Sequence, residues 1–117
     1  MVKYFLKEMN NNAKKLKMFT TNYDSPHGLM NKYNYSSAHD VVLLIEYCMK
    51  MEEFRAVVNT KNFECHAVKS NRPKLTRYRW ENTNKLLGNY DGIIGCKTGI
   101  TNAAGPCFAG YYEKDDE

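Results

Sequence analysis

The sequence predicts a single α+β domain in which helices come first and antiparallel strands follow. Three observations lead to this prediction. Apolar residues recur at three- and four-residue spacings over residues 2–17, and a continuous apolar run occupies residues 41–45. Further along, apolar and polar residues alternate in short runs that turn-forming residues separate. We therefore expect a helical part over about residues 1–60, a hairpin over about 61–80 and a strand pair over about 91–113.

Length and composition fit this class. The chain has 117 residues, of which 43% are hydrophobic and 13% aromatic. This length suits one domain, and this composition excludes a disordered chain. The formal net charge of +4 is mildly basic and does not by itself indicate a nucleic-acid partner. No apolar run is long enough to span a membrane. The apolar residues within 2–9 are interrupted by charged residues too early for the apolar core of a secretory leader, so the compartment stays unknown.

The cysteine pattern does not predict a metal site. Cys48, Cys65, Cys96 and Cys107 form no CxxC pair, and three histidines are scattered along the chain. Zinc sites normally show closer pairs, so we expect neither a metal nor another cofactor. Reduced, packed thiols are the favoured state. Cys48 and Cys107 lie in apolar surroundings, where a thiol behaves as a small hydrophobe.

The first helix should span Val2–Lys17, with its lysines on a solvated face. Its apolar face is formed by Val2, Phe5, Leu6, Met9, Ala13 and Leu16. A loop over Met18–Tyr35 follows and contains the turn residues Asp24, Ser25, Pro26 and Gly28. His27, within this loop, is interpreted as a polar surface group because nothing nearby supplies a partner nucleophile.

A well-signalled second helix follows the loop. Ser36 or Ser37 can cap its free N–H groups, and Asp40 places negative charge in its first turn. The run Val41–Ile45 is apolar on every side, so we expect this helix to be largely buried as it continues through Met49. A short third helix is expected over Glu52–Val58.

The next region is predicted to form a β-hairpin with its turn near Ser70–Pro73. Phe63, Cys65 and Ala67 share one parity before the turn, and the aromatic residues after the turn also share one face. The segment Lys69–Arg79 holds five basic residues and no acid, so a nucleic-acid surface is conceivable. We prefer an exposed basic face and a packed aromatic face, and expect no nucleic-acid partner, because no binding motif accompanies the charge.

The last region carries the most informative tripeptide. Asn82–Leu87 is expected to form a helical turn, Ile93–Gly99 a strand and Pro106–Tyr112 its antiparallel neighbour, joined by a turn over Asn102–Gly105. Lys97, Thr98 and Gly99 stand in a row near the end of the first of these strands. Such a tripeptide is a weak signal alone, and its context gives it weight.

In that context the chain resembles the penicillin-binding D-alanyl-D-alanine carboxypeptidases, relatives of the serine β-lactamases. Two stretches support the resemblance: SPHGLMNKYNYSSAHDVVLLIEYCMK from Ser25 and ENTNKLLGNYDGIIGCKTGITNAAGPCFAGY from Glu81. EMNNNAKKLKM in the first helix supports it more weakly. The resemblance covers most of the chain and implies a partial β-lactamase/transpeptidase-like domain, with an incomplete antiparallel sheet that contains the KTG motif.

The resemblance also implies a task for each residue of the motif. Lys97 would place its ammonium beside the catalytic serine motifs, and Thr98 would offer a hydroxyl to the terminal carboxylate of the substrate. Gly99 has no Cβ, so a peptide could lie against the strand as an added strand. The backbone N–H of Ile100 would face the oxyanion. The implied ligands are peptides that end in D-Ala-D-Ala, and β-lactams.

The chain departs from the family pattern at its serines. Ser25, Ser36, Ser37 and Ser70 form neither S-x-x-K nor Ser-x-Asn, which the family places upstream of the first helix. The family's next strand and closing helix also have no counterpart here, and Ile100 stands where many members have His or Tyr. Loss of such a nucleophile costs about a millionfold in turnover, so we expect this chain to be inactive alone.

Two interpretations of the function stay open. In the first, the chain is part of a serine-type carboxypeptidase that hydrolyses the terminal D-alanine of peptidoglycan stem peptides. In the alternative, it is a non-catalytic relative that binds peptide through the KTG strand. The family works at the cell envelope. In either case, open strand edges should leave the isolated chain marginally stable.

Overall fold

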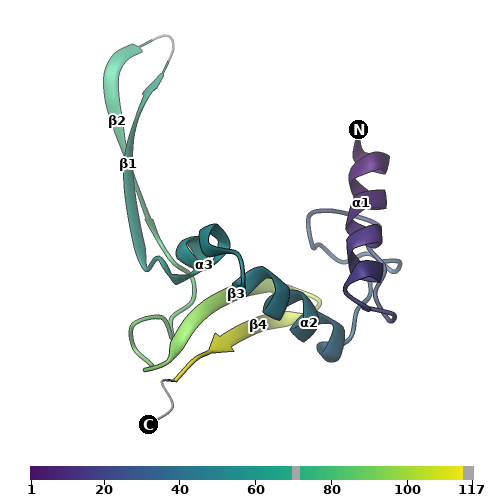
Figure 1. Cartoon of the computed structure of the whole chain (residues 1–117). Helices are drawn as coiled ribbons and strands as arrows, with labels where there is room; N and C mark the ends of the chain where they lie inside the picture. Colours follow the sequence, from purple (N-terminus) through teal and green to yellow (C-terminus); the bar gives the residue numbers. More distant parts are fainter. Residues whose placement is uncertain (70–71, 115–117) are drawn as a thin grey trace.

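The structure, a computed structural model, describes residues 1–69 and 72–114. Three helices precede four strands, which confirms the predicted α+β class (Figure 1). The elements in chain order are α1 (Val2–Lys15), α2 (Ala38–Met49), α3 (Glu52–Asn59), β1 (Asn62–Lys69), β2 (Arg72–Glu81), β3 (Ile93–Thr101) and β4 (Gly105–Tyr112). The strands form two separate antiparallel pairs, β1–β2 and β3–β4.

Helix α1 is amphipathic as predicted, but its apolar face is only partly covered, and the N-terminal end of that face is exposed. It ends at Lys15, and Lys17 turns the chain with a φ of 62°. Ala13 is the buried residue of this helix, whereas the Val2 and Phe5 side chains are more than half exposed. The sequence period therefore fixes which face is apolar, while the packing in this chain leaves much of it open.

Helix α2 begins as predicted and is less buried than predicted. Ser37 is its N-cap and accepts a hydrogen bond from the Asp40 N–H at 3.2 Å. Only Asp40 and Met49 are buried in this helix, and Val42 is 51% exposed. The expectation of a largely buried helix is wrong here because the described elements cover one side of α2 and leave the other side open.

The β1–β2 hairpin projects away from the rest of the molecule (Figure 1). Phe63 pairs with Trp80 in the register, and the ring centroids of this pair are 6.0 Å apart. Tyr78 stacks on Trp80 at 5.6 Å, so the predicted aromatic face is present. It is not packed, however, because Phe63 and Trp80 are both more than half exposed.

The predicted basic face of this hairpin is partly neutralised. Glu64 pairs with both Arg77 and Arg79 across the strands. Of the predicted turn, Ser70 and Asn71 lie outside the described residues, and the next residue, Arg72, already belongs to β2.

The buried apolar residues concentrate where α2 and α3 meet the β3–β4 pair. Met49 of α2 and Cys96 of β3 are buried there, with the Met49 Sδ 3.3 Å from the Cys96 Sγ. Gly95 permits the close approach of α3, because a Cβ there would lie 2.9 Å from Val58 Cγ2. This small core sets the position of β3 relative to the helices.

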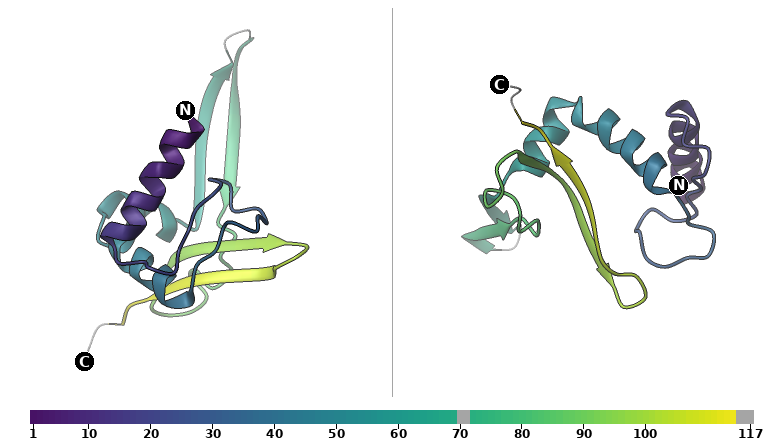
Figure 2. Two further views of the ribbon diagram at one scale, coloured as in Figure 1. Left: turned by 90° about the vertical axis from the view of Figure 1, so that its right-hand side faces the viewer. Right: turned by 90° about the horizontal axis from the view of Figure 1, so that it is seen from below.

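The molecule as a whole is open. Its radius of gyration is 17.2 Å, whereas a compact chain of this length has about 13 Å. Figure 2 shows α1 and its loop at one end of α2, with the β3–β4 pair running out from the other end. Among the described helices, none combines the length and apolar character needed to cross a bilayer.

Candidate functional site

A groove of about 670 Å³ lies along β3, with the segment that follows β2 as its second wall. The groove brings the predicted site residues Lys97, Thr98, Gly99 and Ile100 together on one wall. The remaining lining residues are Thr83, Asn84, Lys85, Leu86, Pro106, Cys107 and Phe108.

The KTG strand presents its side chains to open space. Lys97 is exposed and donates from Nζ to the carbonyl of Thr98, and no ion pair joins it to a carboxylate in the described part of the chain. A Cβ on Gly99 would meet nothing within 4 Å, so the protein's own packing does not require glycine there. Ile100 is 76% exposed. This end of β3 is therefore accessible to a ligand.

Residues 82–84 attach the second wall to the rest of the fold. Asn82 Nδ2 donates to the carbonyls of Val58 (3.2 Å) and Thr60 (3.0 Å) at the end of α3. Asn84 is 4% exposed, and its Nδ2 lies 3.5 Å from the carbonyl of Gly95 on β3. These two amides supply backbone-like hydrogen bonds where no strand or helix ladder is available.

Between the two asparagines, Thr83 reaches the KTG motif directly. Its Oγ1 is hydrogen-bonded to Thr98 Oγ1. The sequence analysis missed this contact because it assigned the segment to a helical turn, whereas the structure has hydrogen-bonded turns only from Lys85 to Asn89. The available signal was the alternation Asn-Thr-Asn, which in an extended segment directs the threonine and the amides to opposite sides.

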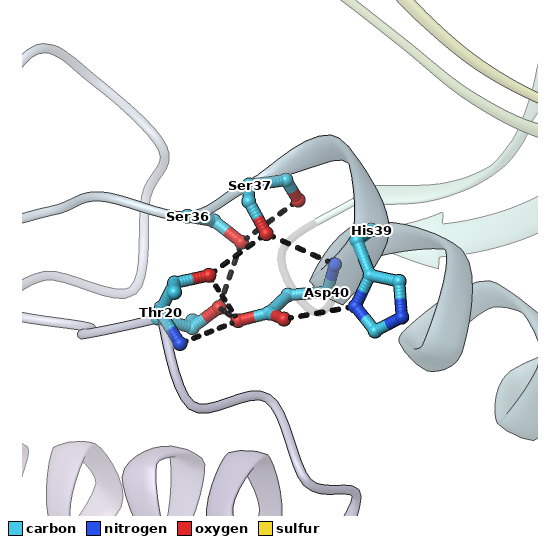
Figure 3. A network of polar contacts seen from close by, with 6 residues as sticks. Thr20, Ser36, Ser37, His39 and Asp40 are labelled. Carbon is cyan, nitrogen blue, oxygen red and sulfur yellow. Dashed lines mark hydrogen bonds and ion pairs between the residues drawn. The ribbon is translucent and has the colours of Figure 1, made fainter.

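The serines near α2 are committed to structural hydrogen bonds (Figure 3). Asp40, 3% exposed, accepts at Oδ2 from Thr21 Oγ1 (2.7 Å), Thr20 N (2.9 Å) and Thr20 Oγ1 (2.9 Å). Ser37 Oγ lies 2.8 Å from Thr20 Oγ1 and also caps α2, as predicted. The cluster joins the loop after α1 to the start of α2.

The same cluster contains a histidine but no activated nucleophile. His39 Nδ1 lies 3.4 Å from Asp40 Oδ1, and the His39 side chain is largely exposed. Ser36 Oγ pairs with Thr21 Oγ1 at 2.8 Å. Within the cluster no serine hydroxyl is bonded to the histidine, so the arrangement lacks the hydrogen bond between nucleophile and base that acyl transfer needs.

The hydrogen bond from Thr21, followed by those from Thr20, lowers the pKa of the Asp40 carboxyl to about 2 despite its burial. The carboxylate is therefore charged at neutral pH and acts as an acceptor only. Such a group is suited to organising the loop rather than to exchanging protons near pH 7.

The thiols differ in exposure, with Cys96 buried, Cys48 and Cys65 half-buried and Cys107 exposed, and one prediction needs correction. All four are free, as expected, but Cys107 is exposed on β4 rather than packed in apolar surroundings. Cys96 is buried with its Sγ 3.3 Å from Met49 Sδ, and burial raises the pKa of its thiol. The difference arises because the outer half of the β3–β4 pair extends beyond the helices.

The loop after α1 also reaches the end of β3. A hollow of about 390 Å³ lies between them, lined by Gly28, Met30, Gly99, Ile100, Thr101, Ala103, Ala104 and Cys107. His27 in this loop is exposed and accepts from the Leu29 N–H at 3.0 Å, which fits its interpretation as a surface group.

Comparison with known proteins gives one consistent result. A sequence model of the D-alanyl-D-alanine carboxypeptidase family matches residues 1–116. The D-alanyl-D-alanine carboxypeptidase of Streptomyces sp. (strain K15) is 38% identical over 106 residues, which are 91% of this chain and 36% of that protein. The carboxypeptidase DacF of Bacillus subtilis is 33% identical over 110 residues, 94% of this chain and 27% of the relative.

Solved structures agree with the sequence relatives. The crystal structure of the Streptomyces K15 DD-transpeptidase has a TM-score of 0.88 and 34% identity, covering 97% of this chain and 43% of that chain. This chain therefore spans less than half the length of the relatives that it matches. The match includes the first helix, the α2 region and the KTG strand in one arrangement. The chain belongs to the serine-type D-alanyl-D-alanine carboxypeptidase family.

Proposed function

We propose that this chain provides the KTG wall of a serine-type D-Ala-D-Ala carboxypeptidase. In this proposal, residues 1–117 are one partial domain, with its helical part at about 1–60, its hairpin at about 61–80 and its KTG strand pair at about 91–113. The substrate is a peptidoglycan stem peptide, and its terminal D-alanine is released through an acyl-enzyme. The exposed KTG strand along an open groove is the observation that supports this most directly.

The proposed roles follow from the position of each group. Lys97 provides an ammonium without a carboxylate partner among residues 1–69 and 72–114. The Thr98 hydroxyl donates a hydrogen bond to the terminal carboxylate, and Gly99 leaves room for a peptide beside the strand. The backbone N–H of Ile100 is one donor to the oxyanion of the tetrahedral intermediate.

The nucleophile is the missing component. Of the chain's four serines, Ser25 is hydrogen-bonded to Asn34, Ser36 to Thr21 and Ser37 to the start of α2, while Ser70 lies outside the described residues. A serine motif on another segment would have to lie against β3 to complete the site. Without that segment, the chain would act as a peptide-binding module, which is the second candidate function.

Two measurements test the proposal. The full chain is titrated with a synthetic stem peptide that ends in D-Ala-D-Ala, and binding is followed by NMR shifts of the Thr98 and Gly99 amides. We expect saturable shifts confined to the groove, and none with a peptide that ends in L-Ala-L-Ala. Equal shifts with both peptides, or shifts elsewhere only, would contradict the proposal.

The second measurement tests whether the chain contains a nucleophile of its own. The chain is incubated with a labelled penicillin and its intact mass is recorded. We expect no covalent adduct on the chain alone, because its described serines are committed to structural hydrogen bonds. A penicilloyl adduct on any serine would show that the chain contains its own nucleophile.

A further inference from the structure

We propose that Thr83 belongs to the substrate site: with Thr98 it forms a hydroxyl pair that binds the terminal carboxylate of the peptide. The inference rests on the proposed function and adds a residue that lies outside the KTG motif. It starts from a direct contact, because Thr83 Oγ1 is hydrogen-bonded to Thr98 Oγ1 at the wall of the groove.

The position of Thr83 is fixed by its neighbours and not by its own side chain. Asn82 bonds the end of α3, and Asn84 reaches the Gly95 carbonyl and also accepts from the Leu86 N–H at 3.1 Å. The backbone of Thr83 is therefore held from both sides. Its side chain is exposed, so its hydroxyl stays available to a ligand in the groove.

Counting hydrogen-bond donors shows why a pair suits an anion. Each threonine hydroxyl has one proton to donate and two lone pairs that accept. When Thr83 donates to Thr98, the Thr98 proton is free to point into the groove, and in the reverse polarity the Thr83 proton is free. In either polarity, one of the two hydroxyls keeps a proton that it can donate to a carboxylate oxygen of the ligand. The hydrogen bond from the other hydroxyl polarises this donor and strengthens its bond to the carboxylate.

The surrounding charge selects the ligand class. Two lysines line this groove, and Lys85 is engaged with Glu81 at 2.9 Å. Lys97 has no such partner within the described residues and stands next to Thr98 in the chain. A cation that lines the same groove as two hydroxyls fits a carboxylate better than a neutral amide, because hydrogen bonds to ionised groups are about twice as strong.

The test compares two ligands that differ in one group. The full chain is titrated with diacetyl-L-Lys-D-Ala-D-Ala and with its C-terminal carboxamide, and both Kd values are read from amide shifts. For the unmodified chain we expect the carboxylate to bind on the order of tenfold tighter than the carboxamide. Thr83→Val should reduce this ratio to about twofold, and Thr83→Ser should retain it.

A matched control removes a threonine hydroxyl outside the groove. Thr60 Oγ1 donates to the Ala56 carbonyl at 2.7 Å, so Thr60→Val should leave the ratio unchanged. If the unmodified chain binds neither ligand, the proposed function fails and this inference with it. If the chain discriminates and Thr83→Val discriminates equally, or Thr83→Ser loses the ratio as well, the role of Thr83 is refuted while the proposed function stands.

Discussion

At the level of single residues, Lys97 and Lys85 form an informative pair. Both line the groove. The Lys85 ammonium lies 2.9 Å from Glu81, four residues earlier in the chain, whereas among the described residues Lys97 bonds a backbone carbonyl and no carboxylate. A cation without a carboxylate partner creates a positive potential that an anionic ligand can use. The two lysines therefore differ in their charge partners although they line one groove.

This difference gives a prediction for binding. Lys97→Met should weaken binding of a D-Ala-D-Ala peptide by about tenfold, because a charge-assisted contact to its carboxylate is lost. Lys85→Met is the matched control and should change the Kd by less than about twofold, because its charge is already offset by Glu81. The Kd from NMR titration checks both. Equal effects of the two substitutions would contradict the assigned role of Lys97.

Asp40 gives a second prediction for a single residue. Its folded pKa of about 2 lies below its ordinary value of 3.8, so its hydrogen bonds stabilise the fold above about pH 4. This contribution is lost as the pH falls from about 4 towards 2, because the carboxyl of the unfolded chain binds a proton in this range while the folded carboxyl still resists protonation. Urea unfolding at a series of pH values should show a drop in stability over this window.

The control for this prediction is Asp40→Asn, which keeps the shape and removes the titrating group. We expect this variant to be less stable than the unmodified chain at about pH 6. Its own free energy of unfolding should fall less than that of the unmodified chain between about pH 4 and pH 2. A variant with the same acid-induced drop as the unmodified chain would show that other carboxyl groups cause it.

Among the elements, the contact between α3 and β3 determines where the KTG strand lies. Val58 of α3 packs directly on Gly95, where a Cβ would come within 2.9 Å of Val58 Cγ2. Further along the same strand the protein leaves the space beside β3 open, since a Cβ added to Gly99 would have no atom within 4 Å. Packing against α3 requires the first glycine, whereas the space beside the second is open.

The two glycines provide a matched pair of substitutions. Gly95→Ala should destabilise the chain by about 1–3 kcal/mol, because α3 or the strand must shift to admit the methyl group. Gly99→Ala should change the free energy of unfolding by less than about 0.5 kcal/mol but weaken peptide binding, since the methyl group occupies the ligand's space. Urea unfolding and the peptide titration give the two readouts. If Gly95→Ala weakened peptide binding without destabilising the chain, and Gly99→Ala destabilised the chain without affecting binding, the two assigned roles would be wrong.

Taken as a whole, the molecule lacks the burial of a self-sufficient domain. Its radius of gyration exceeds the compact value, and among the described side chains no large one is fully buried. The family relatives are more than twice as long, and this chain keeps its arrangement within their fold with a TM-score of 0.88. The exposed apolar faces of α1 and α2 are therefore surfaces that the remaining family elements can cover.

This openness predicts weak cooperativity for the isolated chain. Its urea unfolding should be broad, with a slope below the value of about 1 kcal/mol/M that is the lower limit for small domains. Adding a segment that supplies the family's S-x-x-K motif should sharpen the transition and permit acylation by labelled penicillin. A sharp transition of the chain alone, with no change on addition, would contradict this view.

Local features of the sequence were sufficient for much of the fold. The period of α1, the Ser37 cap, the short α3 and both hairpins could be predicted, because periodicity, capping and turn chemistry act within a few residues. The KTG strand and its antiparallel partner followed from the same local signals together with the family resemblance. The burial of α2 and the surroundings of Cys107 could not be predicted, because they depend on which other elements are present to cover them.

The class of the protein, the order of its elements and the position of Lys97, Thr98 and Gly99 on a strand thus follow from the amino-acid sequence. The three-dimensional arrangement was needed to show that Thr83 meets Thr98, that Asn84 reaches Gly95, and that the groove has two walls. The physical reason is the distance along the chain between the residues that interact. A strand forms from neighbours in the chain, whereas a groove requires contacts between segments whose approach is set by the packing of α3 against β3.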